Sequence, residues 1–262
     1  MTAVLDPDHR EWVAVSPHLS RRVTVELPRV GVQLYRLSAG YLNPLHSHPN
    51  GQLDVILQGS GTHRSAIARR VGKRVVQAVE TVTVQPGECY YVPSGVPHEF
   101  LVGASGPVTI LEILLAPQGT DAPGVPFLGR PAARRGSRWV RHDDRGARRL
   151  VIARTEEAEF VYYELPAAYH GTRHLHPEAQ VGVCLSGTVL HRLSLSVRRG
   201  RRTVRTETDL VVRPGDSYYI PSNVPHESWV RAAPAMFLDV ALRKPGHRAS
   251  SADAAPSVVR AS

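Results

Sequence analysis

A set of side chains suited to metal binding occurs twice in this chain, at a constant spacing of 128 residues. The first copy combines a His-x-His-x3-Gln segment with a later Pro-x-Gly-x2-His segment, and its potential ligands are His46, His48, Gln52 and His98. The equivalent potential ligands of the second copy are His174, His176, Gln180 and His226. Three imidazole nitrogens and one amide oxygen form a set that borderline divalent metals accept. The sequence therefore predicts one divalent transition metal per copy, with iron, cobalt, nickel, manganese, copper and zinc as candidates. The alternative is that the histidines are structural, or that one copy has lost its metal.

These ligands need a scaffold that brings them together, and the surrounding sequence favours β-strands. Two histidines one residue apart share one face of a strand because side chains alternate with a period of two, and the glutamines keep the same parity. No segment sustains an amphipathic helix. Alternating apolar residues predict strands over 23–27, 32–37, 53–57, 108–114, 189–197 and 206–212.

The two copies are an internal repeat of the whole domain. Residues 46–102 match residues 174–230 at 25 of 57 positions without a gap. Many short strands with glycine and proline turns, duplicated in this way, indicate two antiparallel β-barrels or sandwiches in tandem.

At these motifs the chain resembles the cupin superfamily. The two cupin signature blocks are matched by Gly40, His46, His48, Gln52 and Gly59, and then by Gly87, Pro93, Gly95 and His98. The second copy has Ala168 and Asn223 where the pattern has glycine. The resemblance implies an all-β bicupin with two jelly-roll-like antiparallel barrels. We expect an N-terminal cupin domain over 1–118, a linker over 119–138, a C-terminal cupin domain over 139–244 and a disordered tail over 245–262.

Gln52 and Gln180 stand where the commonest cupin pattern has glutamate. This departure argues against glutamate-dependent chemistry such as that of oxalate-decarboxylating relatives. Four neutral ligands leave a divalent metal with its full charge, so its open positions should favour anionic oxygen ligands such as an enolate or a 2-oxo acid.

A narrower resemblance lies in the segment HLHPEAQVGVCLSG, which is similar to the metal block of the bicupin isomerases of bacilysin biosynthesis. Those enzymes move a double bond in a cyclohexadienyl 2-oxo acid, and the resemblance implies the same eight metal ligands. The hairpin between the two blocks is longer here, so the substrate is not carried over.

His63 and His191 occupy equivalent positions, and Asp54 keeps the parity of the first ligand set. His191 shares the apolar face of its predicted strand, so it is expected in the interior, as a further ligand, a general base or a residue that orients a ligand. An interior histidine satisfied by hydrogen bonds is the alternative. Asp54 is a candidate proton acceptor for the first copy only, and its alternative is a strand-end residue that faces water.

The formal charge of +9 and a pI near 10.1 come almost entirely from arginines scattered along the chain. No nucleic-acid-binding module accompanies them, so we interpret them as a solvated surface. The two cysteines fall at non-equivalent positions, and neither a signal peptide nor a membrane-spanning run is recognisable, so we expect a cytoplasmic protein without a disulfide framework or a membrane partner.

Together these features predict a metal-dependent enzyme that acts on a small, anionic, enolisable acid, as an isomerase or tautomerase of specialised metabolism. The alternatives are a non-haem iron dioxygenase of an aromatic or diketone substrate and a noncatalytic small-molecule binder. The expected partner is a small-molecule substrate, and homodimer formation stays open.

Overall fold

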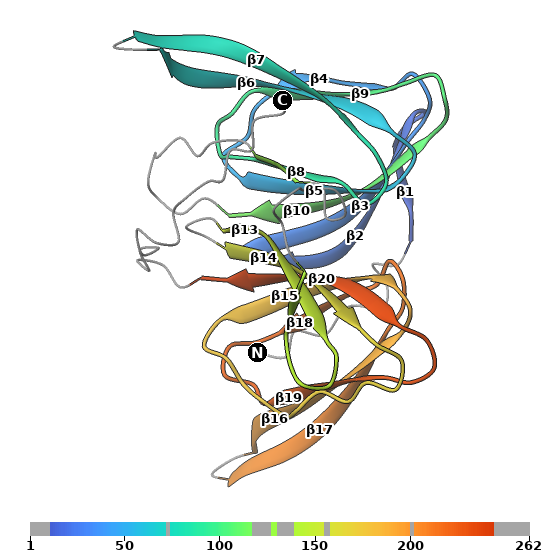
Figure 1. The fold of residues 1–262 in the computed structure, drawn as a ribbon, viewed down its shortest axis with the longest axis vertical. Helices are drawn as coiled ribbons and strands as arrows, with labels where there is room; N and C mark the ends of the chain where they lie inside the picture. Colours follow the sequence, from blue (N-terminus) through green and yellow to red (C-terminus); the bar gives the residue numbers. More distant parts are fainter. Residues whose placement is uncertain are drawn as a thin grey trace. The chain divides into compact units, whose positions relative to one another are not determined.

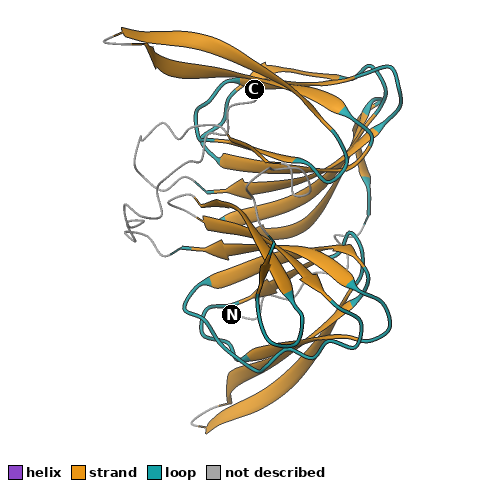
Figure 2. Ribbon diagram, in the orientation of Figure 1, coloured by secondary structure: helices purple, strands orange, loops and turns teal. Residues whose placement is uncertain are grey.

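The structure is a computed structural model that describes residues 11–71, 74–116, 127–129, 139–154, 158–199 and 202–243. It divides into two compact units, Met1–Gly136 and Ser137–Ser262. The regular structure of the described residues consists of β-strands, as Figure 2 shows. The predicted all-β class is therefore confirmed. Most of the expected linker and the whole expected tail lie outside the described residues.

The first unit contains two antiparallel sheets (Figure 1). The larger sheet has the order β1-β2-β3-β10-β5-β8-β11, and the smaller one has the order β4-β9-β6-β7. Its strands are β1 (Val13–Ser16), β2 (Leu19–Leu27), β3 (Val30–Leu37), β4 (Leu42–His46), β5 (Gly51–Gln58), β6 (Gly61–Val71), β7 (Arg74–Val84), β8 (Cys89–Val92), β9 (His98–Val102), β10 (Val108–Leu115) and β11 (Phe127–Gly129). Strand β11 pairs with β8 and falls within the stretch expected as a linker, so that part of the chain extends the first sheet.

The second unit repeats this plan with a larger sheet of order β12-β13-β14-β20-β15-β18 and a smaller sheet of order β17-β16-β19. Its strands are β12 (Val140–Arg141), β13 (Arg148–Arg154), β14 (Ala158–Leu165), β15 (Ala179–Ser186), β16 (Val189–Arg199), β17 (Arg202–Val212), β18 (Ser217–Ile220), β19 (His226–Val230) and β20 (Ala235–Leu242). Where the first unit has β4, the second has two isolated bridges, His170 with Trp229 and His174 with His226. All six strands predicted from the alternating pattern lie inside observed strands.

A core of apolar side chains fills each unit. The first core includes Ile56 of β5, Phe100 of β9 and Ile110 of β10, and the second includes Cys184 of β15 and Phe237 of β20. Residues two positions from these share their face of the strand, which sends Gln52, Asp54 and Glu112 towards the same interior. Polar groups that point into an apolar core must find partners there, because an unpaired buried polar group costs about 1–3 kcal/mol.

Two tight turns fix the loops that carry the site. Gly95 has a φ of 73°, and its amide donates to the carbonyl of His48 at 2.9 Å. Asn223 keeps the left-handed geometry with a φ of 58°, and its amide donates to the carbonyl of His176 at the same distance. Asparagine tolerates this region better than other residues that have a Cβ atom, so the departure from glycine leaves the turn intact.

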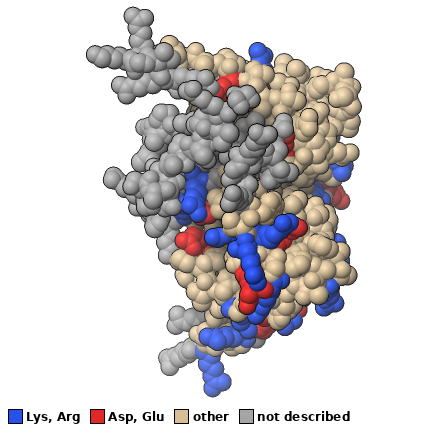
Figure 3. All heavy atoms as spheres, in the orientation of Figure 1, with Lys and Arg blue, Asp and Glu red and all other residues tan. Residues whose placement is uncertain are grey.

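Charges of both signs are interspersed among the described residues of one face of the molecule (Figure 3). On the face drawn in Figure 3, arginine side chains lie next to acidic ones. Arg192, for example, makes a two-point contact with Asp209 at 2.7 and 2.9 Å. This arrangement agrees with the interpretation of the basic residues as a solvated surface. Within the described part of the chain, no helix is long and apolar enough to cross a membrane.

Candidate metal centres

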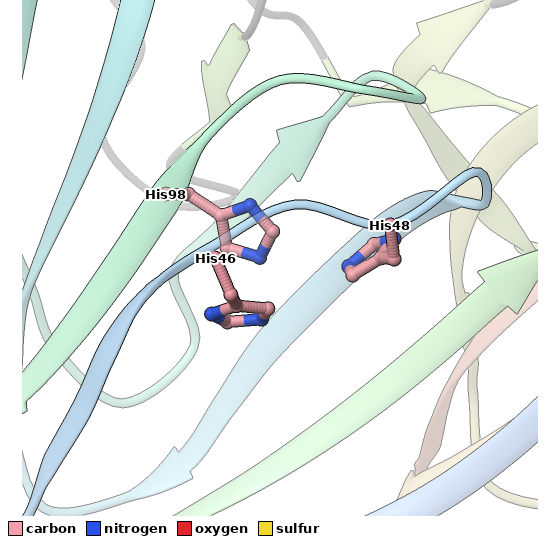
Figure 4. Close-up of side chains that lie close together, drawn as sticks. All are labelled: His46, His48 and His98. Carbon is pink, nitrogen blue, oxygen red and sulfur yellow. The ribbon is translucent and has the colours of Figure 1, made fainter.

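The first cluster joins three histidines from separate parts of the first unit. His46 ends β4, His48 lies in the loop that follows, and His98 begins β9 directly opposite His46. One ring nitrogen of each lies within 4.8 Å of the others. Figure 4 shows the three rings around a common space. His48 is therefore not on a strand as the alternation rule assumed, and its direction comes from the loop and from the turn at Gly95.

The outer ring nitrogen of each histidine is held by a backbone carbonyl two residues away. His46 Nδ1 pairs with Pro44 O at 2.8 Å, His48 Nδ1 with Asn50 O at 2.9 Å, and His98 Nδ1 with Val96 O at 2.9 Å. Because a carbonyl only accepts, each Nδ1 is the donor, and a ring in its neutral form then has its lone pair on Nε2. His98 Nε2 is buried without a hydrogen-bond partner among the described residues. A ring nitrogen left in this state is suited to a metal ion.

Gln52 completes the set from β5. Its side-chain oxygen lies 2.6 Å from His48 Nε2, and its side-chain nitrogen donates to Asp54 Oδ2 at 2.7 Å. The amide oxygen therefore faces the same space as the imidazole nitrogens. The donor set of three neutral nitrogens and one neutral oxygen fits a borderline divalent metal.

The second cluster has the same construction. Nitrogen atoms of His174, His176 and His226 lie within 4.8 Å of one another. Their Nδ1 atoms pair with Thr172 O at 2.8 Å, Glu178 O at 2.6 Å and Val224 O at 2.9 Å. Gln180 places its oxygen 2.8 Å from His176 Nε2. All eight residues that the repeat picked out are thus gathered into two groups of four.

The histidines of each cluster differ in burial. His98 is 3% exposed and His226 is 2% exposed, whereas His46 is half-buried and His174 is exposed. Burial, together with the neighbouring histidines, lowers the pKa of both His98 and His226 to about 4. Both rings are therefore neutral at neutral pH, the state that metal ligation requires.

His63 and His191 both lie inside their units, as parity predicted for His191, and are 4% and 1% exposed. His63 stacks on Tyr90 at 4.0 Å and lies 6.0 Å from the His98 ring, measured between ring centroids. His191 packs on Tyr218 at 4.2 Å, and its Nδ1 pairs with Ser228 Oγ at 2.9 Å. Neither belongs to the groups of three that could share an ion.

The environments of these two histidines keep them neutral. Burial lowers the pKa of each to about 3, and the nearby His98 and His226 add to the shift. His63 Nδ1 and His191 Nε2 are buried without hydrogen-bond partners among the described residues. Each ring thus has one unsatisfied nitrogen close to a candidate metal centre.

Asp54 corrects one expectation. The sequence left open that this residue faces water at a strand end, but it is only 2% exposed and bonds to Gln52. Burial raises the pKa of its carboxyl well above the usual value, and the charge of Glu112 adds to the shift.

Two further carboxyl groups were missed by the sequence analysis. Glu112 of β10 accepts from Gln33 Nε2 at 2.5 Å, and Asp239 of β20 accepts from the Tyr218 hydroxyl. Burial raises the pKa of each to about 7. The signal was present, because each is a lone acid inside an otherwise apolar strand, in the runs VTILEILL and AMFLDVAL.

A surface hollow of about 510 Å³ lies on the second unit. Trp229 and Arg192 line it together with His170, and no predicted ligand does. Arg192 is paired with Asp209, and His170 Nε2 lies 3.3 Å from Glu227 Oε2. The two histidine clusters, each with one buried histidine, are the stronger candidate sites.

Comparison with known proteins supports the architecture. The family described as the cupin domain matches residues 161–241. No curated protein matches the sequence. AerE from Microcystis aeruginosa has a similar structure, with a TM-score of 0.66 and 14% identity over 89% of this chain and 97% of that chain.

Oxalate decarboxylase from Bacillus subtilis is similar as well. One variant gives a TM-score of 0.69 with 15% identity over 92% of this chain and 77% of that chain. A structure concerned with the Mn(II) centres of that enzyme gives 0.66 with 15% identity over 88% and 74%. At such low identity these likenesses show the fold alone.

Proposed function

Because the chain is a bicupin, a member of the cupin superfamily with two tandem domains, we propose that it is a metal-dependent enzyme acting on a small, anionic, enolisable acid. The reaction we propose is an isomerisation or tautomerisation. The observation that carries the proposal is the pair of neutral four-residue ligand sets, each with its Nδ1 atoms fixed and its Nε2 atoms converging.

The ligand set determines what a bound cation would contribute. A divalent ion held by four neutral groups supplies undiminished Lewis acidity, which polarises a carbonyl oxygen and favours the negative charge of an enolate. The residues of the chain orient that ion, exclude water from its buried side and provide places for a proton.

Three groups near the first centre can hold a proton. His63 Nδ1 has no hydrogen-bond partner among the described residues, and the carboxyls of Asp54 and Glu112 lie opposite each other on paired strands. A carboxyl with a pKa near 7, such as Glu112, is matched to proton transfer at neutral pH. His63, with its pKa near 3, is a weak base and is better suited to hydrogen bonding. In the second centre His191 and Asp239 take the corresponding places.

A dioxygenase is the second candidate, because three histidines are also compatible with ferrous iron and leave positions for a substrate and O2. A noncatalytic binder of small acids is the third, since the same centre would hold an anion without turning it over. Both candidates predict the same metal content and differ in what happens to the bound molecule.

The test begins with metal analysis of the chain purified with and without air, where we expect two metal equivalents per chain. The metal-loaded protein is then incubated without O2 in deuterated buffer with a panel of 2-oxo acids and β-diketones. We expect carbon-bound hydrogen next to the carbonyl to exchange, and exchange to persist with zinc in place of iron. Strict dependence on ferrous iron with stoichiometric O2 uptake would establish the dioxygenase, and tight binding without exchange or turnover would establish the binder.

A further inference from the structure

The glutamine ligands raise a problem that imidazole ligands do not have. The two ends of a side-chain amide have nearly the same shape, but only the oxygen can bind a cation. Something must therefore hold the oxygen inward. For Gln52 the NH2 end donates to Asp54 Oδ2 at 2.7 Å, which holds the amide nitrogen on the side away from the histidines.

Gln180 in the second domain has a different support. Its NH2 group lies 3.5 Å from the Tyr218 hydroxyl, and that hydroxyl donates to Asp239. Asp239 also interacts with Gln180 itself. The carboxyl behind the amide therefore comes from β20, whereas in the first domain it comes from β5.

A single glycine explains why the support moved. The residue equivalent to Asp54 is Gly182, where an added Cβ would lie 1.9 Å from Tyr218 Cζ. The tyrosine ring occupies the space that an aspartate at this position would need. Gly182 pairs directly with Asp239 across β15 and β20, the place where the first domain has Glu112 opposite Asp54, so the acid behind Gln180 comes from the neighbouring strand.

We infer that Asp54 and Asp239 are positioning residues, each of which turns the amide oxygen of its glutamine towards the histidine nitrogens. This inference rests on the proposed metal-binding function. Each glutamine and its carboxyl act as one unit, because the carboxyl selects which end of the amide faces the metal. Two domains that reach the same arrangement from different strands support this role.

The unit also accounts for glutamine in place of glutamate. Glutamate has no N–H group to offer, so Gln52→Glu would set a carboxylate oxygen against Asp54 Oδ2 at the present 2.7 Å. Adding Asp54→Asn would restore a hydrogen bond with its direction reversed, from the new amide to the new carboxylate. Glutamate should therefore be tolerated at position 52 only when Asp54 is changed with it, whereas Asp54→Asn alone keeps an acceptor for the Gln52 amide.

The experiment uses Co²⁺ as the probe and the full chain carrying His174→Ala and His176→Ala, so that only the first centre is titrated. Visible absorption follows binding and reports the coordination geometry. Asp54→Leu should raise the Kd for Co²⁺ by about 10- to 100-fold, as loss of a residue that orients a ligand does. Asp54→Asn, whose side-chain oxygen still accepts from Gln52, should change it by less than about tenfold.

A double-mutant cycle covers the case in which Asp54→Leu does not fold. Gln52→Glu alone should bind Co²⁺ more weakly than Gln52→Glu with Asp54→Asn, by about tenfold or more, and the effects should be non-additive. Additive effects, or an unchanged Kd in Asp54→Leu with only a lower unfolding free energy, would overturn the positioning role alone. Absence of Co²⁺ binding in the otherwise unaltered chain would overturn the proposed function and the positioning role together.

Discussion

The two domains carry the same four ligand residues but surround them differently. The first places two acids, Asp54 and Glu112, on facing strands behind its centre, whereas the second has Asp239 and a glycine. His191 has a serine partner in Ser228, and the equivalent position next to His63 is Phe100. The candidate ligands are thus the same in both domains while the buried acids and histidine partners behind them differ, which is what the proposed function would need for a division of labour between two barrels.

The largest effect should come from removing ligands one domain at a time. His46→Ala with His48→Ala, and separately His174→Ala with His176→Ala, should each lower the metal content from two equivalents to one. If one barrel does the chemistry, only its pair should abolish turnover, and the other pair should mainly lower stability through loss of linked metal binding. Elemental analysis and rate measurements on the same samples check this. Equal residual activity in the two variants would contradict a division of labour between the barrels.

The next largest effect should be a loss of folding stability at acid pH caused by the buried His63 and His191. Their folded pKa of about 3 lies below the unfolded value of about 6.5, so the unfolded chain takes up protons first and stability is lost as pH falls from 6.5 towards 3. Glu112 and Asp239, with raised pKa values, oppose this trend between pH 4 and 7, because they favour the folded state more as pH falls.

Single variants separate these opposing trends. In chelator-treated protein, His63→Phe or His191→Phe should each reduce the stability lost between pH 7 and pH 4, by up to about 3 kcal/mol. Denaturant unfolding at both pH values measures the difference. Loss of stability on acidification that matches the unsubstituted chain would mean that the histidine is protonated in the folded state.

Gly182→Ala should lower the free energy of unfolding by a smaller amount, and its effect should be confined to the second domain. The new methyl group would press on the Tyr218 ring, and overpacking of this kind costs about 1–3 kcal/mol. Because the ring also carries the hydroxyl that contacts Gln180, metal should be lost preferentially from the second centre. Asp54→Ala, at the equivalent position, is the matched comparison, and it should spare the second centre. Equal metal loss from both centres in Gly182→Ala would contradict the local effect.

The smallest difference lies at the start of the motifs. Ala168 has a φ of 57° where the first domain has Gly40 at 74°. Alanine in the left-handed region costs about 1–2 kcal/mol, a strain that glycine would relieve. Glycine also has more conformational freedom in the unfolded chain, and this offsets part of the relief. Ala168→Gly should therefore stabilise the second domain by less than about 1 kcal/mol in denaturant unfolding. A decrease in stability would show that the methyl group makes contacts that outweigh the strain.

The repeat predicted the fold and picked out the eight candidate ligands that the structure gathers into two groups, because parity and spacing act locally along the chain. It could not place His48, whose direction depends on a hydrogen bond from the distant Gly95 turn. Asp54 was left open because parity says which face a residue takes but not whether water reaches it. Glu112 and Asp239 escaped notice because their roles depend on neighbouring strands, a relationship that exists only after the sheet has formed.

The uneven burial within each histidine triad gives both centres one side that faces solvent and one side that is buried. His98 and His226 are sealed from solvent, whereas His46 and His174 border it. An incoming anion, a chelator or an exchanging metal would therefore approach from the side of the less buried histidines, which are His46 and His48 in one centre and His174 and His176 in the other. A larger side chain beside His46 or His174 would slow both association and dissociation of the metal while leaving its equilibrium affinity nearly unchanged.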